Sequence, residues 1–162
     1  MSILLLQACS SNGFHLRSEV DLPKIYQRIQ VDNISYDHGL VKAFELALEE
    51  SGGQLLAKAS TIVKINNIRE GKQTVAYTKA RKAREYLLYL KFGYTIEISG
   101  KNASQKREKE TKNQRINLDR IFVYDADFAL GKAEEEKQIR QELYKEAARL
   151  MLLKLQYSKN NT

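Results

Sequence analysis

The sequence has very little of the residues that build disulfides, metal sites and redox centres. It contains one cysteine, two histidines and no tryptophan in 162 residues. A single cysteine cannot form a disulfide within the chain, and His15 and His38 are too few for the usual ligand spacings of a zinc or iron site. We therefore expect neither a metal nor any other cofactor.

Catalytic constellations are scarce as well. Two histidines in unrelated contexts offer no Ser-His-Asp or Cys-His set, and the chain has no glycine-rich phosphate loop. Asp125 and Asp127 form a carboxylate pair, but such residues just before a helix more often cap it. The sequence therefore argues against an enzyme.

Long apolar runs are also missing, since nothing after Cys9 is long and apolar enough to cross a bilayer. The apolar content of 43% is enough for one core. Pro23, the single proline, biases Leu22 toward an extended conformation and indicates the entry to the fold. We expect a signal segment at 1–8, a connector at 9–23, one domain at 24–157 and a polar tail at 158–162.

Positive charge is abundant, with 27 Lys and Arg against 20 Asp and Glu and a net charge of +7. Such a balance favours polyanionic partners, among them nucleic acid, an anionic membrane surface or a phosphorylated lipid. It does not choose among them, and many basic proteins bind none.

The stretch Leu6-Gln7-Ala8-Cys9 has the pattern that a bacterial signal peptidase cuts before lipidating the cysteine. The apolar run from Ile3 to Leu6 is short for a signal peptide, which usually has about 7–15 apolar residues after a charged start. The alternative is that Cys9 is a buried free thiol.

Periodicity predicts the first half of the fold. In Lys24–Asp32 the residues Ile25, Ile29 and Val31 share one face of a strand. Ser35 or Asp37 can then cap an amphipathic helix that stops at Ser51-Gly52-Gly53. Its apolar stripe consists of Leu40, Val41, Phe44, Ala47 and Leu48.

Alternation predicts three further strands, at 60–78, 84–98 and 116–124. Arg69-Glu70-Gly71-Lys72 interrupts the first and suggests a bulge or a turn there. Lys79 to Lys82 forms a hairpin link, and Lys101 to Lys112 reads as an exposed polar loop.

A long second helix follows, with Ile139, Leu143, Ala147, Leu150 and Met151 on its apolar stripe. The fold class is therefore α+β, with a four-stranded antiparallel or mixed sheet, two helices on one face and the order β-α-β-β-β-α. The strand reversals place the turn at 79–82 and Lys132 at one end, and the loop at 101–112 at the other.

Several segments together resemble the lipopolysaccharide-assembly lipoprotein family LptE, also called RlpB. They occur in order from Cys9 to about Leu155, and the Gly-aromatic-His-Leu-Arg element soon after the cysteine is the most specific. The segments are Gly13-Phe14-His15-Leu16-Arg17, Thr74-Val75-Ala76-Tyr77, Arg84-Glu85-Tyr86, Phe128-Ala129-Leu130-Gly131-Lys132 and the terminal amphipathic helix.

The resemblance implies an outer-membrane lipoprotein on the periplasmic side, anchored by lipid such as palmitate on Cys9. It implies that the α/β body plugs the barrel of LptD, and that the pair moves lipopolysaccharide to the cell surface. A basic residue at the hairpin tip and a lysine opening the last helix bind lipid phosphates in that family. Alignment through Arg84-Glu85-Tyr86 makes these Lys79 and Lys132. The family's turn usually carries Asn-Gly where this chain has Ala80-Arg81, so either Lys79 or Arg81 can be the residue that faces ligand.

A basic α+β module that binds nucleic acid is the alternative function. The net charge and the 101–112 run support it. The tyrosines and phenylalanines fall mostly on apolar faces and leave few exposed stacking platforms, so we expect no nucleic-acid partner.

Overall fold

The computed structural model describes residues 22–99, 113–124 and 129–157, so Cys9, the 101–112 loop and the Asp125/Asp127 pair lie outside the described residues. The described chain opens with a short 3-10 helix, η1 (Lys24–Tyr26). The strands and helices that follow are β1 (Arg28–Asp32), α1 (Gly39–Glu50), β2 (Gln54–Leu55), β3 (Thr61–Tyr77), β4 (Ala83–Ile98), β5 (Gln114–Val123) and α2 (Ala129–Tyr157).

The sheet has five strands in the order β2-β1-β3-β4-β5 and is mixed. β1 runs parallel to β2 and β3, whereas β3, β4 and β5 are antiparallel neighbours. The α+β class is confirmed. The predicted four-stranded sheet and the predicted element order are wrong, because the sheet has a fifth strand, β2, between α1 and β3. The missing strand is β2, which is two residues long and therefore too short to show any alternation.

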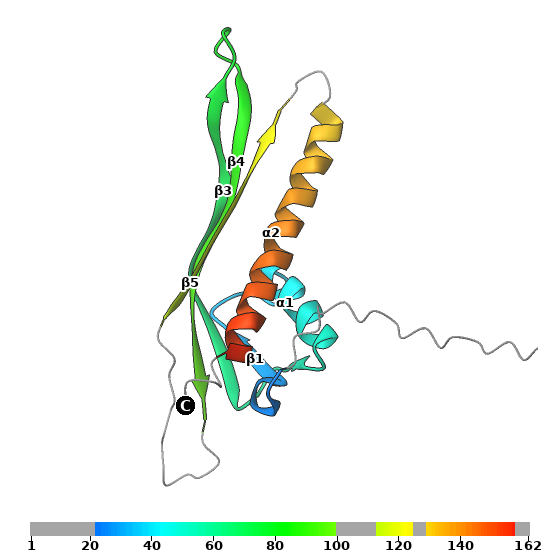
Figure 1. Ribbon diagram of the computed structural model, residues 1–162, viewed down its shortest axis with the longest axis vertical. Helices are drawn as coiled ribbons and strands as arrows, with labels where there is room; N and C mark the ends of the chain where they lie inside the picture. The colour runs from blue at the N-terminus through cyan, green and yellow to red at the C-terminus, as the bar shows by residue number, and fades with distance from the viewer. Residues whose placement is uncertain (1–21, 100–112, 125–128, 158–162) are drawn as a thin grey trace, which may run out of the picture.

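Alternate residues of β4 supply the centre of the core. Leu88, Leu90, Phe92, Tyr94 and Ile96 are all buried. Figure 1 shows α1 and α2 on the same side of the sheet, which is the side that these residues face. Each fully buried side chain of this kind contributes about 1.5–3 kcal/mol. Burial also raises the pKa of Tyr94.

The helices complete this core with the apolar stripes that the sequence predicted. In α1, Leu40, Val41, Phe44 and Leu48 are buried. In α2 the buried side chains are Leu143, Ala147, Ala148, Met151, Leu152 and Leu155, while Ile139 and Leu150 are half-buried.

The predicted strand over Lys24–Asp32 begins too early. The Tyr26 amide donates to the Pro23 carbonyl at 2.8 Å and closes a helical turn instead. This turn exposes 47% of Ile25 and buries Tyr26, so Ile25 does not share the face of Ile29. The strand proper starts at Arg28, and its inward residues Ile29 and Val31 are buried as expected.

The cap of α1 also differs from the prediction. His38 caps the helix, because its Nδ1 accepts a hydrogen bond from the Leu40 amide at 3.1 Å. Ser35 Oγ accepts from the Asp37 amide, so these two residues shape the turn before the helix. The helix stops where predicted, and Gly52 takes a left-handed φ of 74° there.

A bulge in β3 lies a few residues before its predicted place, and two further register shifts lie near the tip, between Thr74 and Ala76 and between Ala76 and Tyr77. The residues from Arg69 to Lys72 pair regularly with β4, and the register shifts between Asn66 and Arg69 instead. Asn67 takes a φ of 49°, and asparagine is one of the few residues that tolerate this conformation. Beyond the bulge the β3–β4 hairpin continues until its tip projects past the start of α2 (Figure 1).

Candidate functional site

The candidate site is the tip of the β3–β4 hairpin, which we call the basic tip and define as residues 78–84. Tyr77 and Ala83 form the last strand pair. The Thr78 amide donates to the Lys82 carbonyl at 2.8 Å, and the Arg81 amide donates to the Thr78 carbonyl at 2.9 Å. Thr78 Oγ1 also accepts from the Lys82 amide at 3.1 Å. These bonds define a three-residue loop of Lys79, Ala80 and Arg81.

Arg81 closes this loop with a left-handed φ of 60°. In three-residue hairpin loops this position is usually glycine, because a side chain in the left-handed region costs about 1–2 kcal/mol. The resemblance led us to expect a turn with two possible registers. The fold has Lys79 and Arg81 at the two ends of one loop, with Ala80 between them.

Among the described residues, the cations of the basic tip have no partners of opposite charge. Lys79, Arg81, Lys82 and Arg84 are all exposed. In the described residues, the ion pairs of the molecule involve other side chains. Four positive charges therefore gather at the far end of the hairpin without neutralisation.

Lys132 lies in a different environment. It belongs to the first turns of α2, and Figure 1 places that end of the helix at the same end of the molecule as the basic tip. Its Nζ lies 2.6 Å from Glu135 Oε2 of the same helix, and 23% of its side chain is exposed. Lys79 and Arg81 are thus brought together in one loop, whereas Lys132 is already ion-paired within α2.

Exposed apolar side chains lie on the strands that lead to the basic tip. Val75 and Tyr77 of β3 are 44% and 64% exposed. Ile121 and Val123 of β5 pair with Leu87 and Glu85 of β4 on the face away from the helices. They are 61% and 49% exposed. The end of the sheet near the hairpin tip therefore combines the basic tip with an apolar flank, which consists of Val75, Tyr77, Ile121 and Val123.

Our sequence reasoning selected Lys79 and Arg81 but missed Lys82, Arg84 and Tyr77. In the sequence Ile121 and Val123 alternate with Phe122, which the structure buries. A search for apolar residues on outward positions near the turn would have found the flank.

Two other kinds of feature are absent from the described residues, namely a metal-binding cluster and a membrane-spanning helix. They hold no group of three or more His, Cys, Asp or Glu side chains arranged to bind a metal. No helix among them is both long and apolar enough to cross a membrane.

The fold is that of several solved bacterial lipoproteins. An uncharacterised lipoprotein B from Nitrosomonas europaea is 19% identical, with 92% of this chain and 94% of that chain covered and a TM-score of 0.68. The rare lipoprotein B from Shewanella oneidensis is 14% identical, covers 83% and 97%, and has a TM-score of 0.67. A minor lipoprotein from Acinetobacter baumannii is 15% identical, covers 85% and 96%, and has a TM-score of 0.64.

The family follows from the sequence match. The family model described as LptE, lipopolysaccharide-assembly, matches residues 26–155, which is most of the chain. The chain therefore belongs to the LptE family. The description of that family is lipopolysaccharide assembly.

Proposed function

We propose that the chain is an outer-membrane lipoprotein, held on the periplasmic side by lipid on Cys9, that plugs the LptD barrel and binds lipopolysaccharide for delivery to the cell surface. The observation that carries the lipid-binding part is the basic tip, with four unpaired cations above an apolar flank. Charged hydrogen bonds to phosphate are among the stronger polar contacts, and guanidinium can bind phosphate through two of them.

The three candidate residues have different parts in this proposal. Lys79 and Arg81 are exposed and form no ion pair with a described side chain, so they meet the lipid phosphates first. Lys132 can contribute only if a phosphate shares it with Glu135 or displaces that carboxylate. We therefore expect substitution of Lys132 to weaken binding less than substitution of the tip.

Charge reversal at the tip tests lipid binding. Lys79→Glu with Arg81→Glu should weaken binding to lipopolysaccharide at least about tenfold, because two attractive contacts become repulsive. The measurement is a titration with labelled lipopolysaccharide, alongside circular dichroism and co-purification with LptD, which should not change.

The matched control is Lys24→Glu with Lys58→Glu, which makes the same change in charge at exposed positions away from the tip. Equal binding by the parent and the tip variant would contradict the proposal. Single-stranded DNA serves as the counter-ligand, because Tyr77 among cations could also stack a base. Tighter, salt-dependent binding of DNA than of lipopolysaccharide would favour the nucleic-acid alternative.

The anchor is tested separately. Expressed with its native export signal, the protein should incorporate labelled palmitate, and Cys9→Ala should move it from the membrane to the soluble fraction. Bacterial lipoproteins carry more than one acyl chain, and a second chain makes anchoring stable. Unchanged membrane association of Cys9→Ala, measured in cells that lack LptD, would refute lipidation as the anchor.

A further inference from the structure

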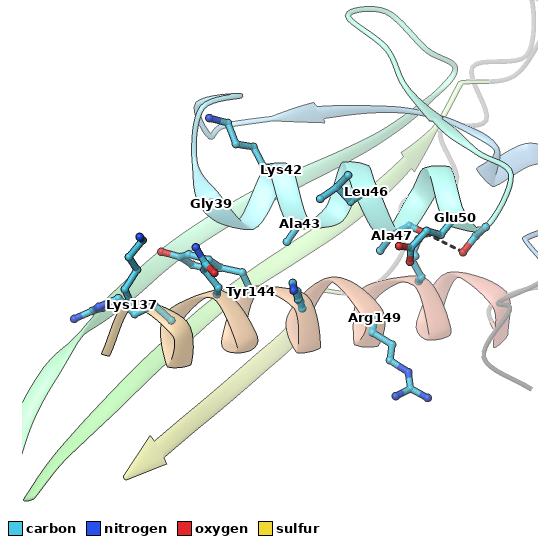
Figure 2. Close-up of a pocket in the computed structure, with 14 residues that line it drawn as sticks. Gly39, Lys42, Ala43, Leu46, Ala47, Glu50, Lys137, Tyr144 and Arg149 are labelled. Atoms are coloured by element: carbon cyan, nitrogen blue, oxygen red, sulfur yellow. Dashed lines mark hydrogen bonds between the residues drawn. The ribbon is translucent and has the colours of Figure 1, made fainter. Parts of the chain in front are cut away.

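A groove lies between α1 and α2 in the described part of the chain. It has a volume of about 1080 Å3 and follows α1 from Gly39 to the C-cap residue Ser51, and α2 from Lys137 to Leu152. The two helices run side by side along it, and Figure 2 shows Ala43 of α1 turned toward α2. Its floor is therefore made of small and apolar side chains.

Leu46 adds a large exposed apolar side chain to the groove. It lines the groove and is 58% exposed. Tyr144 lies between the helices, and its hydroxyl donates to Glu70 of β3 at 2.7 Å. Burial, together with this bond to a carboxylate, raises the pKa of Tyr144 to about 12, so it forms a neutral wall.

The charged side chains that line the groove are almost all cations. Glu50 is the single carboxylate, against Lys42, Lys137, Arg140, Lys145 and Arg149. Figure 2 shows Lys42 and Arg149 on the outer rims, one on each helix. Lys42, Lys137 and Arg140 are partly neutralised by carboxylates outside the groove, namely Asp37, Glu134 and Glu136.

Lys145 and Arg149 are exposed, and neither forms an ion pair with any described side chain. The two are four residues apart on α2 and so project from one face of the helix. The rim of the groove on α2 therefore has two positive charges that no described carboxylate pairs with.

The shape of the groove and the position of its unpaired charge indicate what kind of ligand fits. Lys137 and Arg140 already pair with carboxylates, so the charge left to a ligand is that of Lys145 and Arg149, about 6 Å apart along the helix axis. The groove continues along both helices beside them and contains the exposed apolar side chain of Leu46. An elongated amphipathic peptide can place carboxylates against these two cations while its apolar side chains cover Leu46. The first 21 residues of the chain supply only two carboxylates, Glu19 and Asp21, so a separate partner fits better.

We propose that the groove between α1 and α2 is a docking site for an acidic amphipathic segment of a partner protein. The segment lies along the groove as a third element, with its apolar side on Ala43, Ala47 and Leu46 and its carboxylates toward Lys145 and Arg149. An amphipathic helix in an apolar groove is a recurring mode of peptide recognition. This site is separate from the basic tip and extends beyond the proposed lipid function.

The test uses the full chain and a labelled amphipathic peptide with leucines at i, i+3, i+4 and i+7 and glutamates at the flanking positions. Fluorescence anisotropy should report binding that weakens as salt rises. Lys145→Glu with Arg149→Glu should weaken it about tenfold, whereas the control Lys24→Glu with Lys58→Glu should leave it within about twofold. Leu46→Glu should weaken it as well.

Three results would overturn the proposal. The peptide fails to bind, it binds parent and groove variant equally, or a matched peptide with glutamine in place of glutamate binds as well. Displacement of the peptide by micelles of an anionic lysophospholipid, but not of a zwitterionic one, would assign the groove to a lipid instead. Because the groove variant keeps the basic tip, its binding of lipopolysaccharide should remain at the parental level, which separates this test from that of the proposed function.

Discussion

Arg81 occupies a strained backbone position at the most projecting point of the hairpin. Its φ of 60° suits glycine, yet the residue there is a long, exposed cation. Strain of this kind persists where the surrounding structure fixes it, and it is found often at functional sites. Here the three hydrogen bonds between Thr78, Arg81 and Lys82 fix the loop. The consequence is that charge and conformation at this position can be separated by substitution.

Arg81→Gly should make the hairpin tip more stable while removing a charge. Arg81→Ala removes the same charge but keeps the backbone strain. The hairpin tip of Arg81→Gly should therefore be about 1 kcal/mol more stable than that of Arg81→Ala. Hydrogen exchange at the Thr78 amide should then be about fivefold slower in the glycine variant. If the alanine variant were protected as well as the glycine variant, the left-handed geometry would not describe the loop in solution.

At the scale of elements, α2 is tied to the sheet by polar contacts outside the core. Lys72 of β3 lies 2.6 Å from Glu136, which also pairs with Arg140 one turn later. Arg120 of β5 pairs with Glu146, and Tyr144 binds Glu70. These contacts lie between Glu136 and Glu146 of α2, so they fix the direction of the helix relative to the sheet.

Glu136 should make the stability of this attachment depend on pH. Burial alone would raise the pKa of Glu136, but the hydrogen bonds from Lys72 and Arg140 outweigh it and lower the pKa. A carboxyl with a lowered pKa stabilises the fold above its unfolded value, about 4.3 for Glu, and this contribution is lost as pH falls through the folded value.

Glu136→Gln should therefore lower the free energy of unfolding by about 1 kcal/mol at pH 7, and the difference should shrink below about pH 4. Urea unfolding at several pH values measures both. Glu134→Gln is the control, because Glu134 pairs with Lys137 at an exposed site on the same helix. A difference that stayed constant down to pH 2 would contradict the assignment.

The elements that the sequence predicted well are those whose burial follows a regular period. β4 alternates from Tyr86 to Ile98, and the stripes of α1 and α2 repeat at helical spacing, so one buried face determined each. The strand β2 depends on a parallel pairing with β1 that no local pattern encodes. The cap by His38 was missed because serine and aspartate are the stronger N-cap formers.

The candidate site was predictable in identity but not in geometry. The family resemblance selected Lys79, Arg81 and Lys132. The left-handed turn at Arg81 and the ion pair between Lys132 and Glu135 depend on hydrogen bonds and side-chain contacts that residue types do not fix. The groove between the helices could not be predicted from the sequence, because it depends on the packing of α1 beside α2, which only the tertiary structure shows.

At the scale of the whole molecule, the sheet has one face covered by helices and one face that no described helix covers. Leu88 is fully buried beneath the helices, whereas Ile121, on the strand beside it, is 61% exposed on the open face. The same loss of apolar volume should therefore have very different effects on the two faces.

Leu88→Ala should cost about 2–5 kcal/mol, because it leaves a cavity in the core. Ile121→Ala should change the free energy of unfolding by no more than about 0.5 kcal/mol. Denaturant unfolding of the two variants measures the contrast. Similar losses at both sites would mean that the open face is covered by some part of the molecule.

The mixed sheet also sets an order of assembly. β3 and β4 are joined by a short turn and can pair within microseconds, whereas β1 reaches β3 only after α1 and the residues that follow it have folded back. Synthesis nevertheless delivers β1 and α1 first. Until β4 and α2 arrive, Leu40, Val41, Phe44 and Leu48 have no core to enter. Until synthesis is complete, α1 therefore has an exposed apolar face, and the segment that contains it is the part of the nascent protein that most needs a chaperone.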